Sequence, residues 1–252
     1  MCNLENRIPK KIHYCWFGGK DKSEFILECI KTWKDKMPDY ELIEWNESNY
    51  NINKNSFVKK AYENKRWAFV SDYVRLDVLS QHGGIYLDTD VEVLRPLDEF
   101  LSHNFFAGFE KGIIKDQYLV STAMIASVKN HEIITNFIDF YDSLSEEEFI
   151  NFKTPNTKIL TDLLEKDFNL SSNNKFNDLS NSIFIYPKDY FCAKDWDTKR
   201  LDITKNTFAI HHFDGSWKGK RKKYVDSLFS KINRLSGDKA YLILKKLKNA
   251  KN

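Results

Sequence analysis

The first half of the chain alternates short apolar runs with stretches of helical periodicity. Apolar runs typical of buried strands occupy residues 12–17 and 85–87, and residues 40–45, which include two glutamates, are expected to form another strand. Between them, apolar residues recur every three or four positions at 22–36, 56–65 and 69–80. A strand–helix–strand order with crossovers this long predicts a parallel sheet with helices on its faces.

The second half continues the pattern with less regular spacing. We expect strands at 104–110, 119–126, 183–187 and 207–211, and residues 91–94 as an extension of the strand at 85–87. Helices are expected at 97–101, 131–143 and from Pro155 onward, with another beginning near Ser145. The polar stretch 169–181 indicates a surface loop. The predicted fold class is α/β: a Rossmann-like, mostly parallel sheet flanked by helices, with a C-terminal helical extension.

The segment 66–96 concentrates the candidate chemistry. Gly83 and Gly84 are expected to end its helix, since glycine adopts the left-handed closing conformation without steric cost. The strand after them leads directly into Asp88-Thr89-Asp90. In open α/β sheets ligands bind at the carboxyl ends of the strands, so both carboxylates would meet a ligand there. An isolated D-x-D is more often a polar turn, but here a buried strand and a helix carrying Asp72 and Arg75 precede it.

Composition narrows the class of protein. The chain has 252 residues, 42% of them hydrophobic, and a net charge of +3, which does not favour nucleic-acid binding. Its four cysteines are scattered, so we expect free thiols in a reducing compartment rather than disulfides or a structural zinc site. The N-terminus lacks the apolar core of a signal peptide, and no apolar run approaches membrane-spanning length. The expectation is a cytoplasmic protein.

Charge is unevenly distributed along the chain. From Lys218 onward there are twelve basic and two acidic residues, a net +10 that leaves −7 for the preceding part. Apolar residues recur there at helical spacing, so we predict a catalytic domain over 1–217 and a basic amphipathic tail over 218–252. Such a tail suits an anionic membrane surface, which would make the protein peripheral at the inner face of the membrane. The alternative, given equal weight, is a pair of helices packed on the catalytic domain with a solvated charged face.

The stretch SDYVRLDVLSQHGGIYLDTDVEVLRPLD resembles the sugar-transfer region of the family 32 glycosyltransferases. It carries that family's Ser-Asp-x-x-Arg helix followed by Gly-Gly-x-Tyr-x-Asp-x-Asp. The family includes yeast-type mannosyltransferases and bacterial capsule and lipopolysaccharide enzymes, and it is distantly similar to the glucosyltransferase domain of clostridial toxins. The resemblance implies a GT-A fold, a retaining transferase, and a nucleotide-sugar donor, with a UDP-sugar favoured and a GDP-sugar as the alternative. It further implies Mn²⁺ or Mg²⁺ as cofactor and a glycan or lipid-linked glycan as acceptor.

The same resemblance assigns roles to individual residues. Asp90 would bind the metal, and Asp88 would contact the ribose or reach the metal through water. Asp72 and Arg75 would hold sugar hydroxyls, Tyr86 and Ser71 would line the donor pocket, and Trp16 would stack on the donor's base. For Asp72 and Arg75 the alternative is a helix ion pair, worth roughly 0.2–0.5 kcal/mol. For Trp16 the alternative is a tryptophan of the hydrophobic core. His13 lies inside the first strand and is expected to be a hydrogen-bonded core histidine.

The predicted domain ends on HHFDGSW, a segment that the family also carries. An imidazole there could complete the metal shell, and of the two neighbours we favour His212 over His211. Ser216 and Trp217 could close over the diphosphate. Retention could use a carboxylate on the far face of the sugar as nucleophile, or front-side attack by the acceptor within an ion pair. Glu110 and Asp116 lie in a suitable region for such a carboxylate, but nothing in the sequence selects either of them.

Other classes of protein remain open from the sequence. A D-x-D phosphatase usually carries its pair near the N-terminus with Thr or Val two residues on, whereas here Glu92 stands at that position. A two-metal nucleotidyltransferase would need a third carboxylate from a neighbouring strand. A non-catalytic carbohydrate-binding protein would bind sugar without turning over a donor.

Overall fold

The computed structural model describes residues 7–112, 114 and 117–215. The tail 218–252, together with Ser216, Trp217 and Asp116, lies outside the described residues, so the expectations for them and for a boundary at 217 stay predictions. Within the described part, no helix is both long enough and apolar enough to cross a membrane. Cys15, Cys29 and Cys192 are buried and free, as expected.

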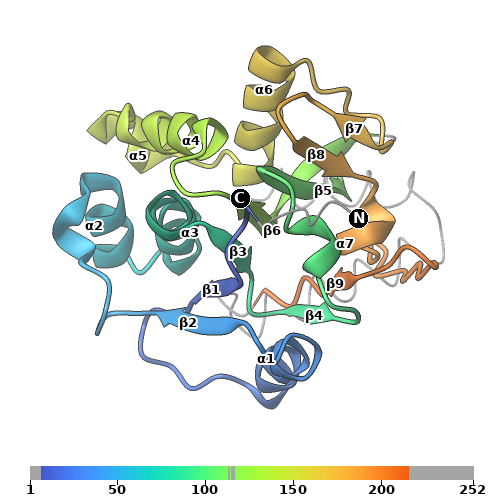
Figure 1. Cartoon of the computed structure of the whole chain (residues 1–252). Helices are drawn as coiled ribbons and strands as arrows, with labels where there is room; N and C mark the ends of the chain where they lie inside the picture. Colours follow the sequence, from blue (N-terminus) through green and yellow to red (C-terminus); the bar gives the residue numbers. More distant parts are fainter. Residues whose placement is uncertain (1–6, 113, 115–116, 216–252) are drawn as a thin grey trace.

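The main sheet has seven strands in the order β2-β1-β3-β6-β5-β8-β7 (Figure 1). Its strands are β1 (Lys11–Cys15), β2 (Glu41–Trp45), β3 (Gly84–Leu87), β5 (Phe105–Lys111), β6 (Tyr118–Ser127), β7 (Asn177–Asp178) and β8 (Ile183–Tyr186). Five of them run in one direction, while β6 and β7 run opposite to their neighbours. The predicted α/β class with a mostly parallel sheet is therefore confirmed, with antiparallel β6 at its centre as an unpredicted feature.

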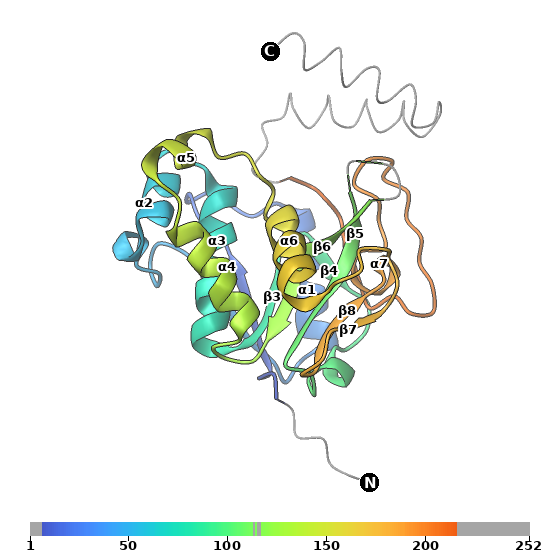
Figure 2. The ribbon, with the colours of Figure 1, turned by 90° about the horizontal axis from the view of Figure 1, so that it is seen from above.

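Helices cover both faces of this sheet. They are α1 (Glu24–Lys36), α2 (Ser56–Glu63), α3 (Trp67–His82), α4 (Glu132–Asp142), α5 (Glu146–Asn151), α6 (Asn156–Phe168) and α7 (Lys188–Phe191), with single 3₁₀ turns at Ile52–Lys54 and Asp98–Phe100. Side chains of α2, α3, α4 and α6 share one buried apolar cluster, and those of α1 and α7 share the other. In both views α3 and α4 lie side by side (Figures 1 and 2).

One predicted strand lies in a different sheet. Residues 91–94 do not extend β3; instead β4 (Val91–Val93) pairs with β9 (Ala209–His211) in a separate antiparallel sheet. The chain changes direction at Asp88–Asp90, where the Val91 amide donates to the Asp88 carbonyl at 3.0 Å. This turn allows β9, which lies more than a hundred residues later in the sequence, to pack against the D-x-D segment.

The helix that precedes β3 ends at its glycines, as predicted, although the ψ of Gly83, −174°, lies outside the left-handed helical conformation that was expected. Gly83 has φ 62° and donates its amide to the Leu79 carbonyl, and Gly84 comes next with φ 110°. A Cβ on Gly84 would lie 2.8 Å from the Lys11 carbonyl oxygen, because β3 enters the sheet directly beside β1. The two glycines therefore allow α3 and β3 to succeed each other without a loop.

His13 is the buried core histidine that the sequence predicts. Its side chain is fully buried, and the Trp45 indole donates to Nδ1 at 3.1 Å. Its Nε2 lies 2.9 Å from the Gly83 carbonyl oxygen and is therefore the protonated nitrogen. Burial lowers the pKa of His13 to about 4, so the ring is neutral.

Candidate functional site

Asp88 and Asp90 lie where β3 ends, at the carboxyl edge of the parallel part of the sheet. The Asp88 amide donates to the Ala123 carbonyl of β6 at 2.8 Å, which fixes the start of the turn. The side chain of Asp88 is 28% exposed and that of Asp90 is 12% exposed. Both carboxylates are therefore anchored in the fold, and Asp88 is the more open of the two to a ligand.

Asp90 is held by the segment that comes after β9. The Asp214 amide donates to Asp90 Oδ2 at 2.7 Å, and the His212 amide donates to the Asp90 carbonyl at 3.0 Å. His211 Nε2 lies 3.5 Å from Asp90 Oδ1. Two elements more than a hundred residues apart in sequence thus form one acidic centre.

The structure corrects the choice between the two histidines. His211, and not His212, faces the aspartates; His212 turns away and its Nε2 lies 2.8 Å from Glu92 Oε2. His211 is the last residue of β9 and His212 follows it; because successive residues of an extended chain point to opposite sides, only one of the pair faces Asp90. The register of β9 on β4, which sets His211 opposite Val91, decides which one. Strand periodicity without that register could not have identified it.

Arg75 forms the second part of the site, from the buried side of α3. Its guanidinium donates to the Thr122 carbonyl at 2.6 Å, to Asp72 Oδ1 at 2.9 Å and to the Ser71 carbonyl at 3.1 Å. It also lies 3.3 Å from Asp88 Oδ1. The side chain of Arg75 is 5% exposed, and it joins Asp72 and Asp88 into a buried ion network. The helix ion pair considered as the alternative is therefore present, but it is buried and is part of a larger network that includes Asp88.

The remaining predicted residues surround this network. Tyr86 is buried, donates its hydroxyl to Asp88 Oδ1 at 3.0 Å and packs its ring under the Arg75 guanidinium. The Ser71 hydroxyl donates to the Trp67 carbonyl of its own helix. Trp16 is half-buried, one residue beyond β1, and its indole donates to the Lys20 carbonyl. The structure therefore brings Asp72, Arg75, Tyr86, Asp88 and Asp90 together, with Trp16 on the neighbouring strand end.

The sequence did not single out every residue near this centre. Asn156, the first residue of α6, donates to Asp72 Oδ1 at 2.5 Å. Lys194 lies with its Nζ 3.4 Å from His212 Nδ1, and Cys192 lies close to His211, as does Glu110, which the sequence had indicated only as a possible nucleophile. These residues belong to elements far apart in the chain, and no local motif connects them to the D-x-D segment.

The charges of the site depend strongly on one another. Burial raises the pKa of Asp72 to about 7, which Arg75 only partly offsets. Although burial opposes it, His211 lowers the pKa of Asp90 to about 2, and Asp90 in turn raises the pKa of His211 well above its usual range. The pair is thus an ion pair, and a cation that binds there must displace the imidazole proton.

The donor set fits a hard divalent cation. One ligand atom each from Asp88, Asp90 and His211 lie within 4.8 Å of one another. Carboxylate oxygens are the ligands that Mg²⁺ and Mn²⁺ prefer, usually one or two of them with substrate phosphates completing the shell. Asp88, Asp90 and His211, rather than His212, are therefore the side chains that lie where such a cation would be held.

The sequence matches one described protein family and several curated proteins. Residues 23–107 match the family described as glycosyltransferase sugar-binding region containing DXD motif. An uncharacterised glycosyltransferase of Acanthamoeba polyphaga mimivirus is 26% identical over 75% of this chain and 76% of its own. The initiation-specific alpha-1,6-mannosyltransferase of Candida albicans is 32% identical over 38% of this chain. These matches confirm the resemblance that the motif indicates.

The chain spans only part of most of these relatives. It covers 76% of the length of the mimivirus glycosyltransferase, 28% of the Candida mannosyltransferase, and 19% of a third match, the subversion of eukaryotic traffic protein A of Legionella pneumophila, to which it is 27% identical. Among solved structures, the apo-form glycosyltransferase GlyE of Streptococcus pneumoniae superposes with a TM-score of 0.50 at 12% identity. That likeness covers 96% of this chain and 64% of GlyE, and it concerns the fold alone.

Proposed function

We propose that this chain moves a hexose from a nucleotide-sugar donor to a glycan, a proposal supported by the match of residues 23–107 to the glycosyltransferase sugar-binding region containing a DXD motif. One observation carries the proposal: Asp88, Asp90 and His211 converge at the carboxyl edge of the sheet, directly beside the Asp72–Arg75 pair. The residues proposed to hold the cation and those proposed to bind the sugar hydroxyls would thus lie side by side, as transfer from a sugar diphosphate requires.

The proposed division of labour is based on the contacts. Asp88, Asp90 and His211 would hold Mn²⁺ or Mg²⁺, which supplies charge neutralisation for the departing diphosphate. Asp72 and Arg75 would bind sugar hydroxyls. Arg75 already donates to Asp72 and the Thr122 carbonyl and pairs with Asp88, so its main task is to orient the two carboxylates. Tyr86 would orient Asp88 through its hydroxyl.

The donor and acceptor are inferred more broadly. Trp16 is proposed as the base platform and Ser71 as part of the donor pocket, with Ser216 and Trp217 closing over the diphosphate. We favour a UDP-sugar, with a GDP-sugar as the alternative, and transfer with retention of anomeric configuration. The acceptor we propose is a glycan of the capsule, O-antigen or lipopolysaccharide type, or its lipid-linked precursor.

A donor screen tests the proposal. The full chain is incubated with UDP- and GDP-sugars in the presence of Mn²⁺, and release of nucleoside diphosphate is measured with and without EDTA. Turnover of at least one donor that stops in EDTA is expected, and the coupling constant of the product's anomeric proton then reports the stereochemistry. Hydrolysis of simple phosphomonoesters without turnover of any nucleotide sugar would favour the phosphatase instead.

Substitutions by Asn test the two carboxylates that are proposed to bind the cation. Asp88→Asn and Asp90→Asn should each lower turnover at least about 100-fold, since each removes a ligand charge while keeping the side-chain shape. The matched control is Asp139→Asn on the exposed side of α4, which should leave turnover unchanged. Full activity of either aspartate variant would remove the cation from the mechanism.

A further inference from the structure

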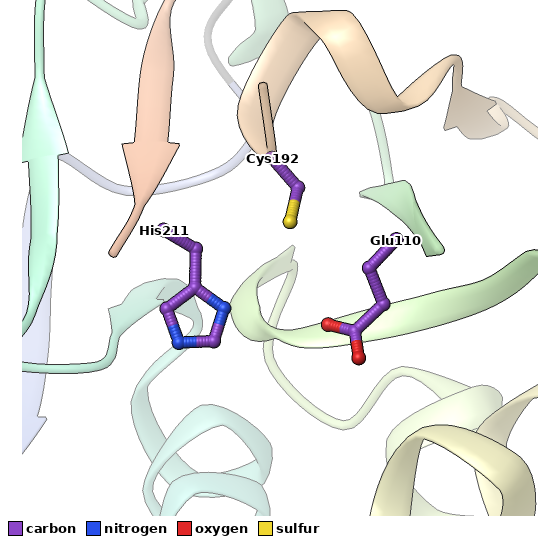
Figure 3. A group of neighbouring side chains, drawn as sticks. All are labelled: Glu110, Cys192 and His211. Carbon is purple, nitrogen blue, oxygen red and sulfur yellow. The ribbon is translucent and has the colours of Figure 1, made fainter. Parts of the chain in front are cut away.

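A second cluster of metal-binding side chains shares His211 with the proposed cation site. It consists of Glu110 on β5, Cys192 just after α7, and His211 at the end of β9. One ligand atom from each lies within 4.8 Å of the others, and the three side chains point into a common space (Figure 3). Neither the binding of the proposed nucleotide-sugar donor nor the D-x-D motif explains why a thiol, a carboxylate and an imidazole should meet there.

His211 presents an unpaired nitrogen to this space. Its Nδ1 is buried without a close hydrogen-bond partner among the described residues, although the Cys192 thiol interacts with the imidazole, and a ring nitrogen faces Cys192 and Glu110 in Figure 3. A buried polar atom left without a partner costs free energy, and the cost is removed when the atom binds a ligand. The other nitrogen, Nε2, faces the Asp90 carboxylate.

The arrangement around His211 is typical of zinc centres. A histidine that binds zinc through one nitrogen usually donates its other ring N–H to a carboxylate, and Asp90 stands in that position. Thiolate, imidazole and carboxylate are all zinc ligands, and three protein ligands leave the fourth tetrahedral position open. Mg²⁺ and Mn²⁺ prefer oxygen ligands, so the thiol distinguishes this cluster from the Asp88–Asp90 pair.

The remaining contacts of the cluster are compatible with a bound ion. The Cys192 side chain is buried, and its sulfur has a long 3.9 Å contact to the Lys194 carbonyl. The Glu110 carboxylate is close to Ser121, and it faces His211. Ligand atoms around tetrahedral zinc lie about 3.5 Å apart, so closing the cluster around an ion needs side-chain movements of about 1 Å.

We propose that Glu110, Cys192 and His211 form a zinc site. This site is distinct from the Mn²⁺ or Mg²⁺ site proposed at Asp88 and Asp90, but the two sites share His211. Zinc on Nδ1 leaves the imidazole proton on Nε2, where it is donated to Asp90. His211 is then unavailable as a ligand for a cation at Asp88 and Asp90. Zinc bound at this cluster therefore weakens cation binding at the aspartates, a consequence that rests on the proposed function, whereas the zinc site itself does not.

Cobalt spectroscopy tests the site without any assay of activity. Co²⁺ is added to the metal-free full chain, and the near-ultraviolet thiolate-to-cobalt charge-transfer absorption is recorded, followed by displacement with Zn²⁺. The wild type should show this absorption and lose it as zinc replaces cobalt. Cobalt binding without the thiolate band would overturn the proposal.

Three variants define the ligands. Cys192→Ser should lose the charge-transfer band and bind zinc at least tenfold more weakly, whereas Cys29→Ser, another buried cysteine, should behave as the wild type. Glu110→Gln should keep the band but bind zinc about tenfold more weakly. A band that survives Cys192→Ser or disappears with Cys29→Ser, or an unchanged affinity in Glu110→Gln, would overturn the three-ligand site.

Manganese binding tests the shared histidine. The affinity for Mn²⁺, measured by electron paramagnetic resonance, should fall about tenfold when one equivalent of zinc is added to the wild type, and should not change in Cys192→Ser. An unchanged Mn²⁺ affinity in zinc-loaded wild type would overturn the competition. If the chain binds no Mn²⁺ at all, the proposed cation site at Asp88 and Asp90 is refuted, while the cobalt experiment still tests the zinc site independently.

Discussion

Arg75 illustrates how a single side chain organises the site. Its guanidinium is nearly fully buried and contacts two carboxylates and two backbone carbonyls. Removing one partner of a buried ion pair leaves an uncompensated charge and costs about 3–5 kcal/mol. Arg75→Ala would therefore confound loss of function with loss of folding, and Asp72 is the better residue to change.

Asp72→Asn should lower sugar transfer at least about tenfold while keeping most of the affinity for free nucleoside diphosphate. The reason is that Asn keeps the side-chain shape but weakens the proposed hydrogen bonds to sugar hydroxyls. Asp77→Asn is the matched control, since Asp77 is buried on the same helix but bonds Tyr50 and Lys54. Transfer rates and nucleotide binding by calorimetry measure the effect, and equal rates in both variants would return Asp72 to a purely structural role.

At the scale of elements, the junction of α3 and β3 sets the position of the site. Gly83 and Gly84 connect the helix that carries Asp72 and Arg75 to the strand that carries Tyr86 and leads to the aspartates. Because no loop separates α3 from β3, the distance between Arg75 on the helix and the carboxylates of Asp88 and Asp90 after the strand is fixed. The close approach of Gly84 to β1 makes this junction sensitive to any side chain.

Gly84→Ala should destabilise the protein more than Gly19→Ala. Both glycines have a positive φ, 110° and 65°, so each alanine costs about 1–2 kcal/mol in backbone strain. A Cβ on Gly84 also meets the Lys11 carbonyl at 2.8 Å, whereas one on Gly19 meets nothing within 4 Å. Urea unfolding should show at least about 1 kcal/mol of extra loss for Gly84→Ala. An equal loss of unfolding free energy in the two variants would mean that β1 shifts to accommodate the added Cβ at little cost.

At the scale of the whole molecule, buried neutral histidines make stability depend on pH. Burial lowers the pKa of His13, His103 and His131 to about 4, from 6.5 in an unfolded chain. The unfolded chain therefore binds more protons between these values, so stability falls as pH drops from 6.5 towards 4. Asp72, whose pKa burial raises to about 7, acts in the opposite direction.

His13 should account for a measurable part of this dependence. Between pH 7 and pH 5 its fully buried ring should cost about 2 kcal/mol, at 1.36 kcal/mol for each pH unit below 6.5. His13→Gln should be less stable at pH 7, yet should lose about 2 kcal/mol less than the wild type on acidification to pH 5. Urea unfolding at both values measures this, and an equal loss in the two proteins would contradict the neutral assignment of His13.

The basic tail bears on where the molecule works. A net charge of +10 beside apolar residues at helical spacing suits an anionic membrane, at roughly 1 kcal/mol per Lys or Arg near the surface. The full chain should co-sediment with anionic liposomes at low salt, and a chain truncated at Gly219 should not. If the full chain ignores such vesicles, or the truncated one binds them equally, the tail serves another purpose.

The sequence alone determined the elements and the acidic motif, because both depend on local chemistry. Periodicity located β1, α1 and β3, glycine conformation ended α3, and the strand before Asp88 and Asp90 placed them at the sheet edge. The path of the chain beyond the aspartates was decided only by the tertiary structure, since β4 leaves the main sheet to pair with β9. That long-range pairing selects His211 over His212, and packing in three dimensions brings Asn156, Glu110 and Cys192 to the site. Contacts between residues a hundred positions apart leave no periodic trace in the chain, so only the folded arrangement could decide them.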